Sequence, residues 1–391
     1  MGTHIRRSLL LTNDFPPVIS GIATVFYHIW KHYDTRRTTV LTPHAPGDSE
    51  FDAGAAFRSV RFPVPFAGTT IGKIGRMKLT AFITAWMVAF RGVREIHAGQ
   101  ILSCGPVGWF FQRVFGIPCC LWVYGGETTD VYRRSRMEEW LVTTLLRSAA
   151  RIVTNSPAVT KEFLDFGIPR ERIIEIIPAV DGAVFTPGSR PAALEKRFGL
   201  AEKTVLLTVA RLTPRKGHDL VLKALDLLRT HGNLHYVIVG SGEDRGRLEG
   251  IVADLGLDGR VIFAGHVADS ELPDYYRLCD IYAMPNRDIV GSTDSMEGFG
   301  ISFIEANACG KPSIAGRAGG TAAAVVDGVT GYLVDPDKPE ELAERIAGLL
   351  DEPQLARQLG ANGRERVERE FDWCERARVL SEACAVDMMP G

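Results

Sequence analysis

The residues best suited to chemistry lie in a glycine-containing stretch, 297–310, which reads EGFGISFIEANACG. Its apolar residues follow helical spacing, and glycines on both sides of Phe299 precede the predicted helix start. Such a junction exposes unpaired backbone N–H groups at the positive end of the helix dipole, where phosphate groups bind. The carboxylates of Glu297 and Glu305 bracket this junction and can accept hydrogen bonds from hydroxyl groups. A ligand that carries both phosphates and hydroxyls, such as a nucleotide sugar, fits this pattern.

An ordinary strand-to-helix turn with two solvated acidic residues would give the same pattern, so this stretch alone leaves both interpretations open. A second segment, 210–217, reads ARLTPRKG and places three cations directly after a predicted strand. Open α/β sheets bind ligands at the carboxyl ends of their strands. Arginine can hold two phosphate oxygens at once, and lysine supplies a mobile point charge. A solvated basic turn is the alternative, but two such segments at strand ends favour a ligand site.

Short apolar runs alternate with helical segments along the whole chain, which predicts parallel sheets covered by helices on both faces. The segment 178–191, which contains prolines and glycines, interrupts this alternation and is the predicted linker. Strands are expected in the first half at 8–12, 38–42, 59–62, 100–104, 118–124, 151–155 and 173–177. Strands are expected in the second half at 204–210, 235–240, 261–264, 281–284, 312–315 and 331–334. The chain therefore reads as an α/β protein with two similar halves that face each other across a cleft.

Composition is that of a globular protein of two ordinary domains, with 391 residues, 46% hydrophobic and 24% charged. The net charge of −2 does not suggest nucleic acid as a partner, although residues 1–150 hold 17 Lys and Arg against 10 Asp and Glu. Seven scattered cysteines, without a CxxC pair, favour a reduced cytoplasmic setting. No secretory signal is recognised at the start, and the longest apolar run, 81–90, is too short to span a bilayer.

The segment 73–90 has a basic beginning and an aromatic helical body. Lys73, Arg76 and Lys78 precede Phe82 and Trp86 at helical spacing. Such a helix can lie on an anionic membrane surface, here the inner face of the membrane. A core-facing amphipathic helix with solvated cations explains the same spacing, and both interpretations remain open.

Three motifs in order carry a resemblance to a known family over nearly the whole chain. ARLTPRKG, the E-x7-E stretch followed by ACGKPSIAG, and the GYLVDP strand resemble the retaining glycosyltransferases of the GT-B fold, family 4. More narrowly, TNDFPP near the start and GFGISFIEANACGKPSIAG are similar to bacterial phosphatidylinositol mannosyltransferases. The resemblance implies two Rossmann-like, doubly wound parallel-sheet domains. We expect an acceptor domain at 1–182, a donor domain at 183–370, and a terminal helix at 371–391 that crosses back to the first domain.

The resemblance also implies roles for matched residues. Arg211 and Lys216 would hold the diphosphate of the donor in place of a metal ion. Glu297 would accept hydrogen bonds from the sugar hydroxyls, close to the backbone amides of Phe299 and Gly300. No metal ligands are expected.

Further donor contacts are implied at Ile301, which follows Gly300, and at Glu305, which would hold the ribose hydroxyls. Gly21 in the first loop would let the backbone approach the phosphates or the acceptor, although a plain turn glycine is equally open. The family commonly has a histidine beside the sugar where this chain reads YGGE. That role would pass to Tyr124 or Glu127, and a purely structural role for either is open as well.

The implied reaction moves a hexose of the mannose or glucose type from a GDP- or UDP-linked donor to a hydroxyl. The acceptor would be a glycan, a lipid-linked sugar or a small molecule, with retention of configuration and no cofactor. An epimerase or phosphorylase of the same fold is the alternative within enzymes. A nucleotide-sugar binding protein without catalysis is the alternative outside them.

Overall fold

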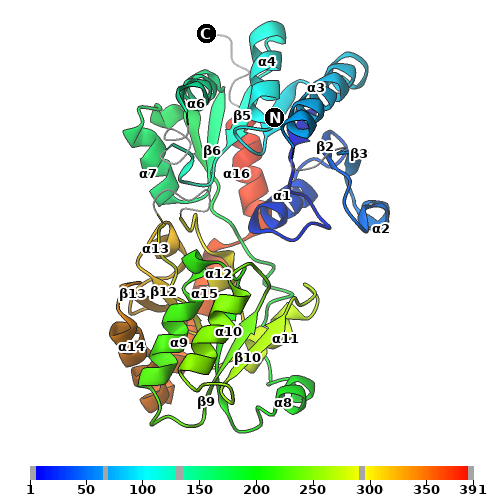
Figure 1. Cartoon of the computed structure of the whole chain (residues 1–391). Coiled ribbons are helices and arrows are strands. Elements are labelled where there is room, and N and C mark those ends of the chain that lie inside the picture. The colour runs from blue at the N-terminus through cyan, green and yellow to red at the C-terminus, as the bar shows by residue number, and fades with distance from the viewer. Residues whose placement is uncertain (1–5, 65–68, 129–134, 290–295, 386–391) are drawn as a thin grey trace. The chain divides into compact units, whose positions relative to one another are not determined.

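The structure, a computed structural model, describes residues 6–64, 69–128, 135–289 and 296–385, apart from the side chains of residues 70 and 71. The chain forms two compact units (Figure 1). Unit 1 comprises Met1–Pro178 and Trp373–Gly391, and unit 2 comprises Ala179–Asp372. The division between the units therefore lies at Pro178, whereas the sequence predicts it at residue 182. The carboxy-terminal helix is part of unit 1.

Unit 1 is built on a seven-stranded sheet whose order is β3-β2-β1-β4-β5-β6-β7, with every pair parallel. Its strands are β1 Ser8–Leu11, β2 Thr38–Pro43, β3 Arg58–Phe62, β4 Glu95–Ala98, β5 Cys119–Trp122, β6 Arg151–Thr154 and β7 Ile173–Glu175. Its helices are α1 Gly21–His32, α2 Asp48–Gly54, α3 Thr70–Arg91, α4 Gly105–Phe115, α6 Arg136–Ser148, α7 Pro157–Asp165, α16 Trp373–Ala385 and the 3₁₀ turn η1 Arg170–Arg172. Right-handed crossovers in both directions from β1 put helices on both faces of the sheet.

Unit 2 has a six-stranded sheet of order β10-β9-β8-β11-β12-β13, again parallel throughout. Its strands are β8 Thr204–Val209, β9 Leu234–Val239, β10 Val261–Gly265, β11 Ile281–Met284, β12 Ser313–Gly316 and β13 Gly331–Val334. Its helices are α8 Ala192–Phe198, α9 His218–Leu227, α10 Arg245–Asp254, α11 Leu272–Leu278, α12 Ile301–Ala308, α13 Thr321–Ala324, α14 Pro339–Asp351, α15 Pro353–Glu370 and the 3₁₀ turn η2 Pro214–Lys216. Leucine, isoleucine and valine side chains from β8, β9, α9 and α14 form one continuous buried core in this unit.

The fold confirms the predicted pair of parallel-sheet α/β domains, but the sequence prediction placed one strand of unit 1 at the wrong residues. The strand expected at 100–104 is β4 at Glu95–Ala98, and Gln100 begins a turn that leads into α4. The Gln100 side chain accepts a hydrogen bond from the Asn13 backbone N–H at 2.9 Å. Glu95 and His97 look like surface residues in the sequence, yet they are 3% and 0% exposed. Their burial hid the strand from the hydropathy pattern.

Two helices also differ from expectation. The helix α2 was not predicted, because its seven residues carry three acidic side chains and little apolar periodicity. The spacing of residues 321–327 predicts a helix through that range, but the helix α13 ends at Ala324, after one turn. Among the described residues, no helix combines the length and the hydropathy that a membrane-spanning helix requires.

Candidate functional site

The site in unit 2 is formed where the strand order reverses. The first strand of the unit, β8, lies between β9 and β11, so the chain leaves β8 in one direction and returns on its other side. The crevice at the carboxyl ends of two such strands is where open α/β sheets bind ligands. Three segments begin at this edge of the sheet, at residue 210 after β8, at residue 285 after β11 and at residue 317 after β12.

A close backbone approach, a hydrogen bond and an ion pair hold the loop after β8 against the loop after β11. Gly217 has a φ of 75°, and a Cβ on it would lie 2.1 Å from the Pro285 carbonyl oxygen, so only glycine fits there. The Arg287 backbone N–H donates to the Arg215 carbonyl at 2.9 Å. The Arg287 guanidinium in turn pairs with Asp219 at 2.8 Å. These contacts fix the direction in which the side chains of the basic turn η2 leave the backbone.

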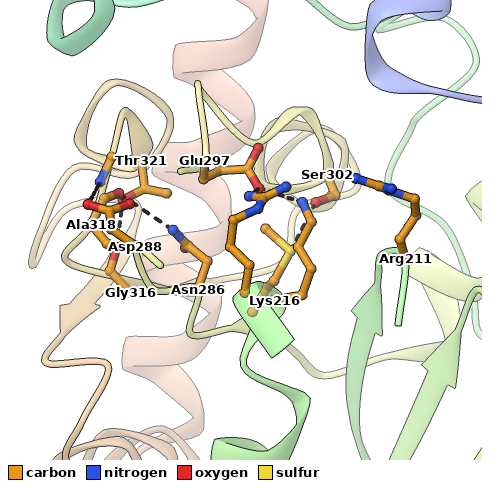
Figure 2. A network of polar contacts seen from close by, with 12 residues as sticks. Arg211, Lys216, Asn286, Asp288, Glu297, Ser302, Gly316, Ala318 and Thr321 are labelled. Atoms are coloured by element: carbon orange, nitrogen blue, oxygen red, sulfur yellow. Dashed lines mark hydrogen bonds and ion pairs between the residues drawn. The ribbon is translucent and has the colours of Figure 1, made fainter. Parts of the chain in front are cut away.

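Glu297 is the carboxylate that this basic turn meets. Its Oε2 accepts a hydrogen bond from Arg215 Nη1 at 2.7 Å. The same oxygen contacts Lys216 Nζ (Figure 2). Burial alone would raise the pKa of Glu297, but attraction to Lys216 and Arg215 outweighs it and lowers the pKa to about 2. The Glu297 carbonyl accepts from the Gly320 N–H at 2.7 Å, so the loop after β12 is attached as well.

The helix α12 begins directly beyond this ion-pair cluster. Gly300 is its N-cap with a φ of 92°, and a Cβ there would lie 2.4 Å from Phe303 Cδ2. Ile301 is the first helical residue. Phe299 is buried, and its ring packs edge-on against Phe371 with centroids 5.8 Å apart. The packing of Phe299 therefore holds the backbone N–H groups at the helix start in place, next to the Arg215 and Lys216 side chains.

Glu305 lies one turn into α12 and has a different environment from Glu297. Its Oε2 accepts a hydrogen bond from the Tyr276 hydroxyl at 2.6 Å. Burial raises the pKa of Glu305 to about 7, even though this hydrogen bond favours the ionised form. The pKa values of the two carboxylates of the E-x7-E stretch therefore shift in opposite directions, because both are buried but only Glu297 faces two cations.

The three cations of the 210–217 segment divide into two kinds. Arg215 and Lys216 are buried or nearly so against Glu297, whereas Arg211 is exposed. Figure 2 shows Arg211 on the loop after β8 and Ser302 at the first turn of α12. The Arg211 carbonyl contacts Nε2 of the buried His218 at 3.3 Å. Arg211 and Lys216 were predicted from the sequence and Arg215 was missed, because residue types alone do not show which way each side chain leaves a 3₁₀ turn.

Two residues of the loop after β11 complete the support and were also missed. The Asn286 Nδ2 reaches the Ala318 carbonyl at 3.5 Å, and Asp288 Oδ2 accepts from the Gly319 N–H at 3.2 Å (Figure 2). Burial raises the pKa of Asp288. Only the register of β12 against β11 brings these loops together, and no sequence spacing signals it.

In unit 1 the strand order reverses at β1, which neighbours both β2 and β4, and Gly21 follows this strand. Gly21 begins α1, and the preceding Ser20 caps the helix by accepting from the Ala23 N–H at 3.0 Å. Tyr124 and Glu127 follow β5. The Glu127 carboxylate accepts from the Tyr124 and Gly125 backbone N–H groups at 2.6 and 2.7 Å.

These contacts give both side chains a structural task. Burial raises the pKa of Glu127 to about 7 in spite of its two amide partners. The Tyr124 hydroxyl donates to the Gly99 carbonyl at 2.9 Å, which joins the turns after β5 and β4. The YGGE turn is therefore braced from within, and the left-handed φ values of 102° and 81° at Gly125 and Gly126 require the two glycines.

The chain matches two protein-family models and is similar to named bacterial proteins. Residues 20–178 match the family model described as a glycosyl transferase 4-like domain, and residues 190–366 match that described as glycosyl transferases group 1. The chain is 31% identical over 405 residues to a Mycobacterium tuberculosis protein named GDP-mannose-dependent alpha-(1-6)-phosphatidylinositol monomannoside mannosyltransferase, covering 96% of this chain and 97% of that one. It is 35% identical over 323 residues to a D-inositol 3-phosphate glycosyltransferase of Acidothermus cellulolyticus, covering 75% and 68% of the two chains.

Solved structures share the fold at lower identity. HepE from Anabaena, in complex with UDP and glucose, aligns with a TM-score of 0.81 at 21% identity, over 98% of this chain and 100% of that chain. Sucrose-phosphate synthase from Thermosynechococcus elongatus aligns with a TM-score of 0.79 at 23% identity, over 96% and 97%. These neighbours have the GT-B fold, which confirms the fold class expected from the sequence motifs.

Proposed function

Because the chain belongs to the group 1 glycosyltransferases, we propose that it transfers a mannose-type hexose from a nucleoside diphosphate sugar to a hydroxyl of an inositol-containing lipid. We further propose that the configuration at the sugar is retained and that the donor site needs no metal ion. The observation that carries this proposal is the meeting of Arg215, Lys216 and Glu297 beside the glycine-capped start of α12.

The donor diphosphate would bind between the basic turn and the helix start. Lys216 contacts Glu297, and its ammonium group carries a positive charge and three N–H donors that suit phosphate oxygens. The amides at the start of α12 and the exposed Arg211 add positive potential at the same mouth. Fixed cations and dipoles of this kind stabilise negative charge as it develops on the departing diphosphate, which is the role that a metal ion performs in other enzymes.

Glu297 would accept hydrogen bonds from the sugar and would also position the Lys216 and Arg215 side chains. Its ionised state is secured by Lys216 and Arg215, so it remains a hydrogen-bond acceptor for sugar hydroxyls at every physiological pH. Glu305 would accept from the ribose hydroxyls, with Tyr276 orienting its carboxylate. Phe299, Gly300 and Ile301 would contribute backbone rather than side chains. Retention follows if the leaving diphosphate takes the proton of the incoming hydroxyl, since the transfer then occurs on one face of the sugar.

A peripheral membrane contact of unit 1 would bring such an enzyme to a lipid acceptor. On α3, Phe82 and Phe90 are 73% and 74% exposed, and Trp86 is 43% exposed, so the aromatic body of this helix is not packed on the sheet. Beside it, α3, α4 and α6 enclose an apolar groove of about 310 Å³. Its lining includes Trp140 of α6, which is 64% exposed, and Lys78. Cations next to exposed aromatic rings are the arrangement of interfacial helices.

Donor binding can be tested first, by thermal shift with GDP-mannose, UDP-glucose and UDP-galactose. A donor at a hundred times its dissociation constant adds about 2.7 kcal/mol, which corresponds to a Tm rise of roughly 5 to 10 °C for a unit of this size. Lys216→Ala and Glu305→Ala should each reduce the rise, whereas Lys223→Ala, an exposed lysine on α9, should leave it unchanged. Equal rises in all four proteins would remove the site assignment.

Transfer itself is tested with phosphatidylinositol mannoside acceptors and the donor that gives the largest thermal shift, with the anomer of the product read by nuclear magnetic resonance. An inverted product would refute the retaining mechanism. Membrane contact is tested by sedimentation with anionic vesicles, comparing K73E/R76E/K78E with the matched triple change K31E/R36E/R37E, whose residues are exposed elsewhere on unit 1. Only the first variant should lose binding, and equal binding by both would refute the contact.

A further inference from the structure

Four metal-ligand side chains converge on one face of the sheet of unit 1, separate from the Gly21, Tyr124 and Glu127 loops. Glu95 and His97 lie two residues apart on β4, so they point to the same face. In the adjacent strand β5, Cys120 is the register partner of His97 and shares that face. Cys384 on α16 covers this face, with its Sγ 3.8 Å from Cys120 Sγ. Residues from two neighbouring strands and from the carboxy-terminal helix thus meet in one cluster.

The cluster is compact and buried. One ligand atom from each residue, two thiol sulfurs, an imidazole nitrogen and a carboxylate oxygen, lies within 4.8 Å of all the others. The four residues are at most 7% exposed. Tetrahedral zinc with bonds of about 2.3 Å to sulfur separates two thiolates by roughly 3.8 Å, which equals the separation of the two sulfurs here.

Two polar contacts within the cluster involve the His97 ring. Among the described residues, the one ion pair of Glu95 is with His97, whose Nε2 lies 2.7 Å from Glu95 Oε1. The Trp122 indole N–H donates to His97 Nδ1 at 3.3 Å. The His97 Nε2, although close to Glu95, lacks the alignment of a hydrogen bond to any described group.

We propose that Glu95, His97, Cys120 and Cys384 bind one thiophilic divalent cation, for which Zn²⁺ is the chemical match. Two sulfurs, one imidazole and one carboxylate are ligands that zinc takes in closed tetrahedral sites. The bound cation supplies the charge that a buried carboxylate requires. Binding releases the two thiol protons to solvent, since the thiolates are the ligands. The site holds structure rather than catalysing a reaction, because it ties α16 to the sheet.

The tautomer of His97 makes this assignment specific. Zinc on Nε2 requires the proton on Nδ1, where it would face the Trp122 N–H, so the indole must turn aside on binding. Trp122→Phe removes that opposing donor and should tighten metal binding several-fold. Weaker binding in this variant would overturn the use of Nε2 as a ligand.

The test uses the full chain, purified under reducing conditions, stripped with a strong chelator and titrated with Co²⁺ and with Zn²⁺. We expect one metal per chain, a thiolate-to-cobalt charge-transfer band, and the visible bands of tetrahedral Co²⁺. Zinc should raise the Tm by about 5 °C. Cys120→Ser and Cys384→Ser should abolish the charge-transfer band or weaken binding at least a hundred-fold.

Cys119→Ser is the matched control, because Cys119 precedes Cys120 on the same strand and points to the opposite face, against Gly108 of α4. This variant should bind like the wild type. Wild-type protein without a charge-transfer band, or a band that survives both Cys120→Ser and Cys384→Ser, would overturn the proposal. The wild-type spectrum tests metal binding even if a variant fails to fold.

Discussion

Replacing Glu297 by glutamine keeps the shape of the side chain and removes the charge that Arg215 and Lys216 contact. The pKa of Glu297 falls from its ordinary value of 4.5 to about 2, and that difference corresponds to about 3 kcal/mol of folding stability. Glu297 is only 9% exposed, so solvent screening reduces this value little. Breaking a buried ion pair typically costs about 3 to 5 kcal/mol, which agrees with this magnitude.

The pH dependence of the loss follows from the direction of the shift. A carboxyl group whose pKa is lower in the folded chain stabilises the fold above its unfolded pKa. The contribution of Glu297 is therefore complete above about pH 4.5 and is lost as the pH falls toward 2. Glutamine cannot titrate, so the difference between Glu297→Gln and the wild type should be largest at neutral pH and shrink in acid.

The assay is urea unfolding of both proteins at about pH 7 and about pH 3, followed by far-ultraviolet circular dichroism. Tryptophan fluorescence would not report the unfolding of unit 2, which contains Glu297, because all six tryptophans lie in unit 1. Glu368→Gln is the matched control, since its partner Arg364 holds it in an exposed pair at 2.6 Å, which is worth about 1 kcal/mol at most. A loss for Glu297→Gln as small as for this control, or equal at both pH values, would refute the reasoning.

Three further outcomes are expected. Burial raises the pKa of Glu305 to about 7, so the wild type should lose stability as the pH rises from about 4.5 to 7, and Glu305→Gln should lack that slope in the same urea assay. Gly300→Ala should cost about 1 to 3 kcal/mol and abolish the donor-induced thermal shift, because its Cβ would lie 2.4 Å from Phe303; Gly250→Ala, with nothing within 4 Å of its Cβ, should cost nothing. Chelator should leave the initial rate of sugar transfer unchanged at low temperature while lowering the Tm, and a rate restored by added Mn²⁺ would refute a metal-free donor site.

The amino-acid sequence by itself determined the architecture and the region of the candidate site in unit 2. Alternating apolar strands and helices require parallel sheets with covered faces. This periodicity is local, so it can be recognised in the sequence without knowing any tertiary contact. Gly300 and Gly217 are equally local, since a left-handed backbone at a strand-to-helix turn demands glycine. The stretch 297–310 and the basic turn 210–217 follow from the same kind of reasoning.

The tertiary structure decided which side chains meet. It brought Arg215, rather than Arg211, against Glu297, and it gave Tyr276 to Glu305, because strand register and the 3₁₀ turn set those directions. It also turned Glu95 and His97 inward, where a helix from the far end of the chain covers them. The periodicity of a sequence indicates which face of a helix or strand a side chain occupies. The residues that pack against that face come from distant segments, so only the tertiary structure identifies them.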